Sequence, residues 1–261
     1  MAPYRVEEAT PDLHALAVWD ESWRSYNNCY LLRRSTADRR VVLIDAGKAE
    51  HGAALLEALT RLGVAPADVA AVVATHGHAD HVGGVASLPG VPGHLHAADV
   101  GLLPPAERAA WRTDLPDRGP VPGLPELGCV LLGHHTVGSV ALYHAPTRAL
   151  FWGDHVCFFG APLDDDGLVG LGAARRERVL RGVAWRRAHW PPDDAEQARM
   201  RADLANRAPE DQRRHDFPLQ VEGVERAVAL GEAEVLCTGH GPVLRGGVGP
   251  FLAALLAAAR G

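Results

Sequence analysis

The stretch THGHADH at positions 75–81 constrains this 261-residue chain more than any other feature. It follows the apolar run VAAVVA, which predicts a buried strand. Side chains two apart in extended backbone point to the same side, so His76 and His78 can converge on one ion. Asp80 and His81 follow as the chain turns into a helix, where they can reach a second ion. Imidazole and carboxylate ligands suit zinc, so the stretch predicts a metal site.

Three further histidine or aspartate motifs lie downstream: GHHTVGS at 133–139, FWGD at 151–154 and TGHGP at 238–242. An apolar run, VVLI, also ends at Asp45. The order HxHxDH, later His, Asp and final His resembles the metallo-β-lactamase superfamily over roughly residues 26–245. The chain departs from the family pattern at His134 and Val137, where Gly and Pro are usual.

The resemblance implies two sets of metal ligands joined by one carboxylate. The first ion is expected at His76, His78 and His135, and the second at Asp80, His81 and His240, with Asp154 bridging them. His135 is preferred to His134 by register, because neighbours in an extended segment point to opposite sides. Asp45 is expected beside the metals, where it would orient a histidine.

The implied cofactors are two divalent ions, zinc first, with iron or manganese as alternatives. Water held between two cations loses much of its proton affinity, which gives a metal-bridging hydroxide near neutral pH. This hydroxide would attack a carbonyl or phosphoryl centre. Asp80 could hand a proton to the leaving group, so Asp80 and Asp154 are the expected catalytic carboxylates.

Alternating strand and helix patterns imply layers of sheet and helix, an α/β fold. The resemblance specifies an αββα four-layer sandwich, a single domain over residues 1–261, with a helical insertion at 173–230 before the last ligand. Strands are expected at 13–19, 29–32, 41–44, 69–74, 130–132, 139–143, 149–152 and 234–237. Helices are expected at 51–62, 82–88, 173–189, 194–206, 221–230 and 251–260. Pro- and Gly-rich residues 103–127 are expected to form a long loop.

The composition limits the binding partners and the cellular location that we expect for this chain. The formal net charge of −6 argues against nucleic acid as the main partner. The N-terminus has no apolar signal region, and the longest apolar stretch, 251–259, is far below the roughly 20 residues that span a bilayer. We therefore expect a cytoplasmic protein without a membrane partner. The four cysteines are widely spaced and are expected to be thiols. The oligomeric state is left open.

The substrate must be inferred from the walls of the site. Six side chains are candidates for substrate contact: Trp19, Trp23, Tyr26, His155, Phe158 and Phe159. The aromatic ones could equally pack the core, and His155 could be a packed core histidine. The insertion could form a lid, and its 11 Arg against 8 acidic residues between 175 and 216 could receive an anionic substrate. A solvated helix face is the alternative meaning of these charges.

The first choice of function is hydrolysis of a small-molecule thioester, ester or lactone, as in the glyoxalase II and lactonase-like branch. Glyoxalase II-like enzymes place their helical domain after the last histidine ligand, whereas only 21 residues follow His240 here. A phosphodiesterase or nuclease with the same metals is the alternative. A metal-binding partner protein without catalysis is a third possibility.

Overall fold

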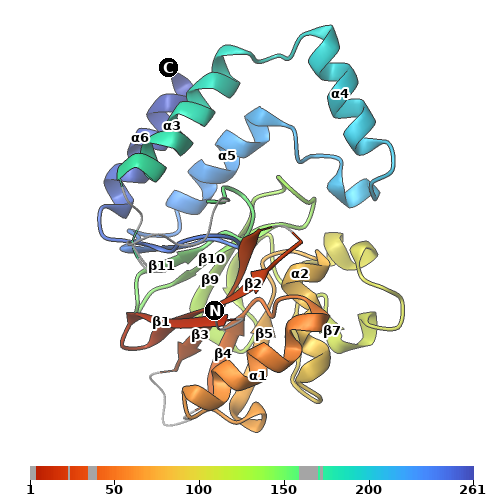
Figure 1. Ribbon diagram of the computed structural model, residues 1–261, viewed down its shortest axis with the longest axis vertical. Helices are drawn as coiled ribbons and strands as arrows, with labels where there is room; N and C mark the ends of the chain where they lie inside the picture. The colour runs from red at the N-terminus through yellow and green to blue at the C-terminus, as the bar shows by residue number, and fades with distance from the viewer. Residues whose placement is uncertain (1–3, 23, 35–39, 159–169, 171–172) are drawn as a thin grey trace.

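Two β-sheets lie face to face at the centre of the fold, and helices cover their outer faces (Figure 1). The computed structural model describes residues 4–22, 24–34, 40–158, 170 and 173–261. The first sheet contains, in spatial order, β1 (Tyr4–Thr10), β2 (Leu13–Asp20), β3 (Ser25–Arg33), β4 (Val41–Ile44), β5 (Val69–Val73), β6 (Gly93–His94) and β7 (Trp111–Arg112). The second contains β13 (Leu244–Arg245), β12 (Val235–Cys237), β11 (Ala149–Phe151), β10 (Val140–His144), β9 (Leu124–Leu131) and β8 (Arg118–Val121).

Three apolar layers hold the sandwich together. Between the sheets, Tyr30 of β3 packs against Phe151 of β11, with ring centroids 5.3 Å apart. On the outer face of the first sheet, α1 (Gly52–Arg61) buries its apolar stripe against the strands. On the outer face of the second sheet lie α3 (Ala173–Ala188), α5 (Phe217–Val228) and α6 (Val248–Arg260). The predicted αββα arrangement is therefore confirmed.

The segment between α3 and α5 arches away from the second sheet (Figure 1). Its helix α4 (Asp194–Leu204) buries none of its residues. The chain then returns through a 3₁₀ turn at Pro209–Asp211, where the Val137 N–H donates to the Glu210 carbonyl at 2.8 Å. The helical segment thus touches the body of the protein again beside the predicted His135 loop.

Three local predictions need correction. The loop expected over 103–127 is wrong from residue 118 onward, because residues 118–131 form the β8–β9 hairpin; Pro120 concealed it, and β8 tolerates proline because it is an edge strand. The helix expected at 82–88 is α2 (Ala79–Val82) followed by a 3₁₀ segment. Helix α5 begins at Phe217, because Pro218 is accommodated in the first turn.

Strand ends from both sheets meet at one edge of the sandwich. β4 and β5 are parallel neighbours, and they lead into Asp45 and the 75–81 stretch. β11 and β12 are also parallel, and they lead into Asp154 and His240. The sheets are joined there by the Val140 N–H, which donates to the Thr75 carbonyl at 2.9 Å. Among the described helices, none is long and apolar enough to cross a membrane.

Close backbone packing behind the 75–81 stretch gives a first prediction. The Gly84 N–H donates to the Gly47 carbonyl, and a Cβ on Gly84 would lie 1.9 Å from the Ala46 carbonyl oxygen. Gly84→Ala should therefore lower the free energy of unfolding by roughly 2 kcal/mol or more. Gly249→Ala is the matched control, since no atom lies within 4 Å of its added methyl group. Equal melting temperatures for the two variants would contradict this packing.

Candidate metal centre

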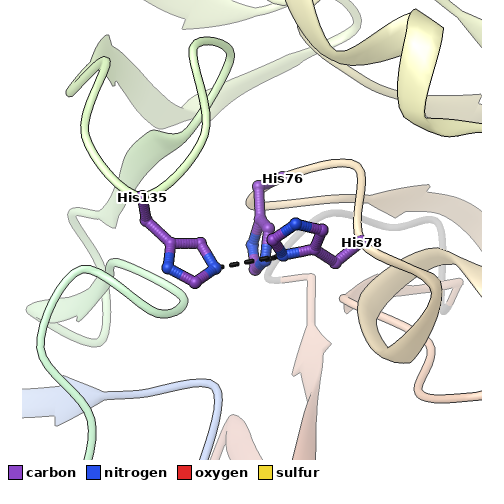
Figure 2. Close-up of side chains that lie close together, drawn as sticks. All are labelled: His76, His78 and His135. Carbon is purple, nitrogen blue, oxygen red and sulfur yellow. Dashed lines mark hydrogen bonds between the residues drawn. The ribbon is translucent and has the colours of Figure 1, made fainter. Parts of the chain in front are cut away.

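Three histidine side chains converge in a first cluster. His76 and His78 come from the loop after β5, and His135 comes from the loop between β9 and β10 (Figure 2). The His78 Nδ1 lies 2.9 Å from the His76 Nε2 and 3.0 Å from the His135 Nε2. His135 has a φ of 73°, in the left-handed region that is uncommon for residues other than glycine. His134, the neighbour, lies outside the cluster.

Two carboxylates and two histidines form a second cluster: Asp80, His81, Asp154 and His240. The Asp80 Oδ2 lies 3.4 Å from the His81 Nε2 and 3.2 Å from the His240 Nε2. Asp154 approaches the same histidines, with its Oδ1 3.4 Å from His81 and its Oδ2 3.3 Å from His240. All four side chains are almost completely buried.

The spacing of these atoms fits a metal ion better than hydrogen bonding. The Asp80 Oδ2 and the His81 Nε2 are buried and close, but no hydrogen bond of ordinary geometry satisfies either atom within the described residues. Two ligands of one zinc ion lie roughly 3–3.5 Å apart, because each sits about 2 Å from the metal. Both clusters match that separation, so the residues present fit two divalent ions.

The Asp154 carboxylate lies between the two clusters. Its Oδ2 is 3.6 Å from the His135 Nε2 of the first cluster and 3.3 Å from the His240 Nε2 of the second. The Cys157 thiol also donates to the Asp154 Oδ1 at 3.2 Å. The structure therefore brings all seven predicted ligands together, with one carboxylate within reach of both sets.

Hydrogen bonds orient four of the imidazoles from behind. Nδ1 of His81 donates to the Asp45 Oδ2 at 2.8 Å, and Nδ1 of His240 donates to the Tyr26 carbonyl at 3.0 Å. His76 Nδ1 contacts the Thr75 hydroxyl, and His78 Nε2 contacts a carboxylate described below. In each pair the outer nitrogen is engaged, so the inner nitrogen faces the cluster and can offer its lone pair to a metal ion once any proton on it is displaced.

Asp45, predicted to lie beside the metals, is buried at the end of β4 with a φ of 59°. Its Oδ1 accepts the Thr75 N–H at 2.7 Å, and its Oδ2 accepts the Thr75 hydroxyl at 2.9 Å. The same carboxylate holds His81, as described above. Asp45 thus couples the start of the ligand loop to a histidine of the second cluster.

Asp99 is a buried carboxylate that no sequence motif indicated. It accepts the Gly77 N–H at 2.8 Å, the Gly138 N–H at 2.6 Å and the Thr136 hydroxyl at 2.6 Å. Burial raises its pKa, although these three donors lower it. Asp99 fastens the loop of His76 and His78 to the loop of His135, so it sets the spacing of the first cluster.

Asp211 is a second residue that the sequence did not indicate. It belongs to the helical segment, yet its Oδ1 lies 2.7 Å from the His78 Nε2. This contact joins positions 133 residues apart, and no local pattern could have marked it. It connects the helical segment directly to the first cluster.

The protonation states differ between the two clusters. Burial lowers the pKa of His135 to about 3 although Asp154 opposes it, and burial with neighbouring histidines holds the pKa of His76 well below its usual range. In the second cluster burial also acts against charge. There Asp154 and Asp80 outweigh it and raise the pKa of His240 to about 9. His76 and His135 of the first cluster are therefore neutral, whereas the second cluster carries protons that a cation must displace.

A cavity of about 960 Å³ opens onto both clusters. His78, Asp80, His135 and Asp154 line one side of it. The opposite side comes from the helical insertion, which here means residues 173–230 with α3, α4 and α5. It includes Val183, Trp185, Arg186, Arg214 and Gln220. Any molecule that fills the cavity therefore contacts the clusters and the helical segment together.

Among the described residues, one of the predicted substrate contacts lines the cavity and the others do not. His155 lines the cavity and is otherwise buried. Tyr26 and Phe158 are buried in the core, and Trp19 packs on Tyr26 with ring centroids 5.0 Å apart. None of these three aromatic residues lines the cavity. Trp23 and Phe159 lie outside the described residues.

The chain belongs to the metallo-β-lactamase superfamily, whose family profile matches residues 23–240. It is similar to the metallo-beta-lactamase domain-containing protein 1 of Mus musculus, with 51% identity over 53 residues. That match covers 20% of this chain and 20% of the mouse protein, about a fifth of either length. The hydroxyacylglutathione hydrolase of Pectobacterium carotovorum is 29% identical over 191 residues, covering 65% of this chain and 70% of that protein.

Solved structures share the fold. A variant of a flavo di-iron protein from Thermotoga maritima superposes with a TM-score of 0.69 and 16% identity, covering 99% of this chain and 63% of that one. The DIM-1 metallo-beta-lactamase superposes with a TM-score of 0.59 and 14% identity, covering 98% and 97%. At these identities the likeness concerns the fold alone.

The Asp211 contact predicts a role in metal affinity. Asp211→Ala removes the acceptor that orients His78, so zinc affinity of the first cluster should fall about 10- to 100-fold. Asp203→Ala is the matched control, because Asp203 also pairs with a histidine of the helical segment, His215, at 2.7 Å. Competition with a chromogenic chelator measures both variants. Equal zinc affinities in the two variants would rule out this role for Asp211.

The raised pKa values predict that metal binding at the second cluster depends on pH. His240, with a pKa of about 9, is protonated at pH 7, and the pKa of His81 is also raised well above its usual value. Protons and metal compete for these nitrogens, so affinity should rise with pH by about one to two orders of magnitude per unit between pH 6 and 8. Chelator competition across that range measures the slope. A flat profile would contradict the assignment.

Proposed function

We propose that this protein is a binuclear metal-dependent hydrolase that cleaves a small-molecule thioester, ester or lactone. The observation that carries the proposal is the position of Asp154, between two ligand clusters and on the wall of a cavity. Two divalent ions bound there, zinc first and iron or manganese otherwise, would activate water near neutral pH and stabilise negative charge on the substrate.

The chain's own residues have distinct roles in this proposal. His76, His78 and His135 would hold the first ion, and Asp80, His81 and His240 would hold the second. Asp154 would serve both ions, and Asp45 keeps His81 in the orientation that presents Nε2. Asp80 lines the cavity, and in this proposal its carboxylate would pass a proton to the leaving group.

One observation supports a carbonyl substrate, and a second supports a substrate of small size. The Pectobacterium relative is, by its name, a hydrolase of a hydroxyacylglutathione. The cavity is also within the range of volumes that enclose a small organic molecule. The arginine residues of the cavity favour a second candidate, a phosphodiesterase or nuclease with the same metals, because guanidinium groups bind phosphate well.

One experiment separates these activities. Metal content of the purified protein is measured together with turnover of a thioester, an aryl ester, a lactone and bis-p-nitrophenyl phosphate. The proposal predicts about two zinc ions per chain and turnover of at least one carbonyl substrate. Turnover of the phosphodiester alone would transfer the assignment to the second candidate. One iron per chain without hydrolysis would overturn both.

The bridging assignment gives its own prediction. Asp154→Ala should lose metal occupancy and hydrolysis together, because the same carboxylate serves both ions. Asp114→Ala is the control: Asp114 also pairs with a histidine, His94, at 2.8 Å, but it does not line the cavity. Metal analysis and turnover are measured on both variants. Two retained metals with full activity in Asp154→Ala would refute the bridge.

A further inference from the structure

The cavity has a charged end that the metal clusters do not explain. Arg186 of α3 lines it, and its guanidinium group is partly buried. The guanidinium donates to the Gln220 side-chain oxygen at 2.5 Å and to the His215 carbonyl at 3.2 Å, and it lies 5.3 Å from the centre of the Phe217 ring. Within the described residues, Arg186 forms no ion pair with a carboxylate. The groups that the guanidinium contacts are neutral, and the Asp216 carboxylate acts on it only from beyond ion-pair distance. A cation placed in this way beside a cavity favours an anionic ligand.

The other arginines of the cavity differ in how well they are neutralised. Arg207 forms an ion pair with Asp203, at 3.0 Å between NH2 and Oδ1. Arg214 lies 3.9 Å from Asp211, whose carboxylate already contacts His78 at 2.7 Å. Arg207 is therefore closely paired, whereas Arg214 lies at the long limit of an ion pair with a carboxylate that it shares with His78.

Hydrogen-bonding groups at the same end are incompletely used. His134 is 3% exposed, and neither of its ring nitrogens makes a hydrogen bond of ordinary geometry to the described residues, although a backbone group of Arg214 interacts with the ring. His155, 1% exposed, donates through Nε2 to the Gln220 carbonyl and leaves Nδ1 without a partner in the same set. Buried polar atoms are normally satisfied, so these nitrogens point to a polar ligand.

Apolar side chains of α3 line the cavity alongside Arg186. Trp185 is 57% exposed and lines the cavity, and it is the exposed large hydrophobic side chain of the described chain. Its ring stacks on His189, with centroids 4.4 Å apart. Val179 and Val183 of the same helix line the cavity as well. A ligand with an apolar chain between two polar ends would match this lining.

We infer that the substrate is an anion, an acyl compound whose carboxylate or phosphate group is bound by Arg186 while its scissile carbonyl faces the metal clusters. Arg214, His134 and His155 line the same cavity. The inference rests on the proposed hydrolase function and adds the substrate class. It makes Arg186 a specificity-determining residue, because a guanidinium group pairs with oxyanions in a charge-assisted geometry.

Paired esters of one phenol test this inference on the metal-loaded full chain. Mono-4-nitrophenyl glutarate carries a terminal carboxylate, and 4-nitrophenyl pentanoate is its neutral analogue. Arg186→Gln should lower the ratio of kcat/KM for the anionic ester over the neutral ester by roughly tenfold or more. Arg186→Lys, which keeps the charge, should restore part of the ratio. Arg181→Gln is the control, since Arg181 lies on the same helix, pairs with Glu177 and does not line the cavity.

A direct binding measurement keeps this test independent of catalysis. Calorimetric titration with glutarate and with inorganic phosphate should show weaker binding in Arg186→Gln than in Arg181→Gln, and the anion that responds identifies carboxylate or phosphate as the recognised group. Weakened anion binding without ester turnover would uphold Arg186 as an anion-binding residue and contradict the hydrolase. An unchanged ester ratio together with equal anion binding in the two variants would overturn the inference.

Discussion

The metal centre depends on the Asp99 carboxylate, because it holds two ligand loops at a fixed distance. One loop carries His76 and His78, and the other carries His135. Asp99 accepts one backbone N–H from each loop, and glycine occupies both positions because a Cβ would come within 3 Å of Asp99. A buried carboxylate with three short hydrogen bonds is costly to displace, so the loops keep their spacing without a metal.

Two further carboxylates hold histidines of the clusters in place. Asp45 orients His81, and Asp211 orients His78, so each cluster has a carboxylate behind one of its histidines. The Asp211 contact also means that the helical segment is part of the metal centre and not only its cover. Arg186 belongs to the same helical insertion (173–230), so the residue proposed to bind an anion and the residue that orients His78 lie in one structural unit.

The sequence indicated the candidate ligands because metal coordination imposes local patterns. Two histidines two residues apart at the end of a strand, followed by Asp and His in a turn, can be read from the chain alone. Asp99 and Asp211 could not be read in this way, since each acts through contacts between distant segments. The aromatic candidates Tyr26 and Phe158 pack in the core, because apolar character does not distinguish a core residue from a pocket wall. The cavity is lined instead by charged side chains, among them Arg186 and Arg214.

Anomalous X-ray diffraction from zinc-loaded crystals tests the central claim most directly. The account predicts two zinc peaks roughly 3.5–4 Å apart. One should be surrounded by His76, His78 and His135, and the other by Asp80, His81 and His240, with Asp154 in contact with both. A single peak, or a second peak outside these side chains, would contradict the binuclear centre on which the proposed hydrolysis depends.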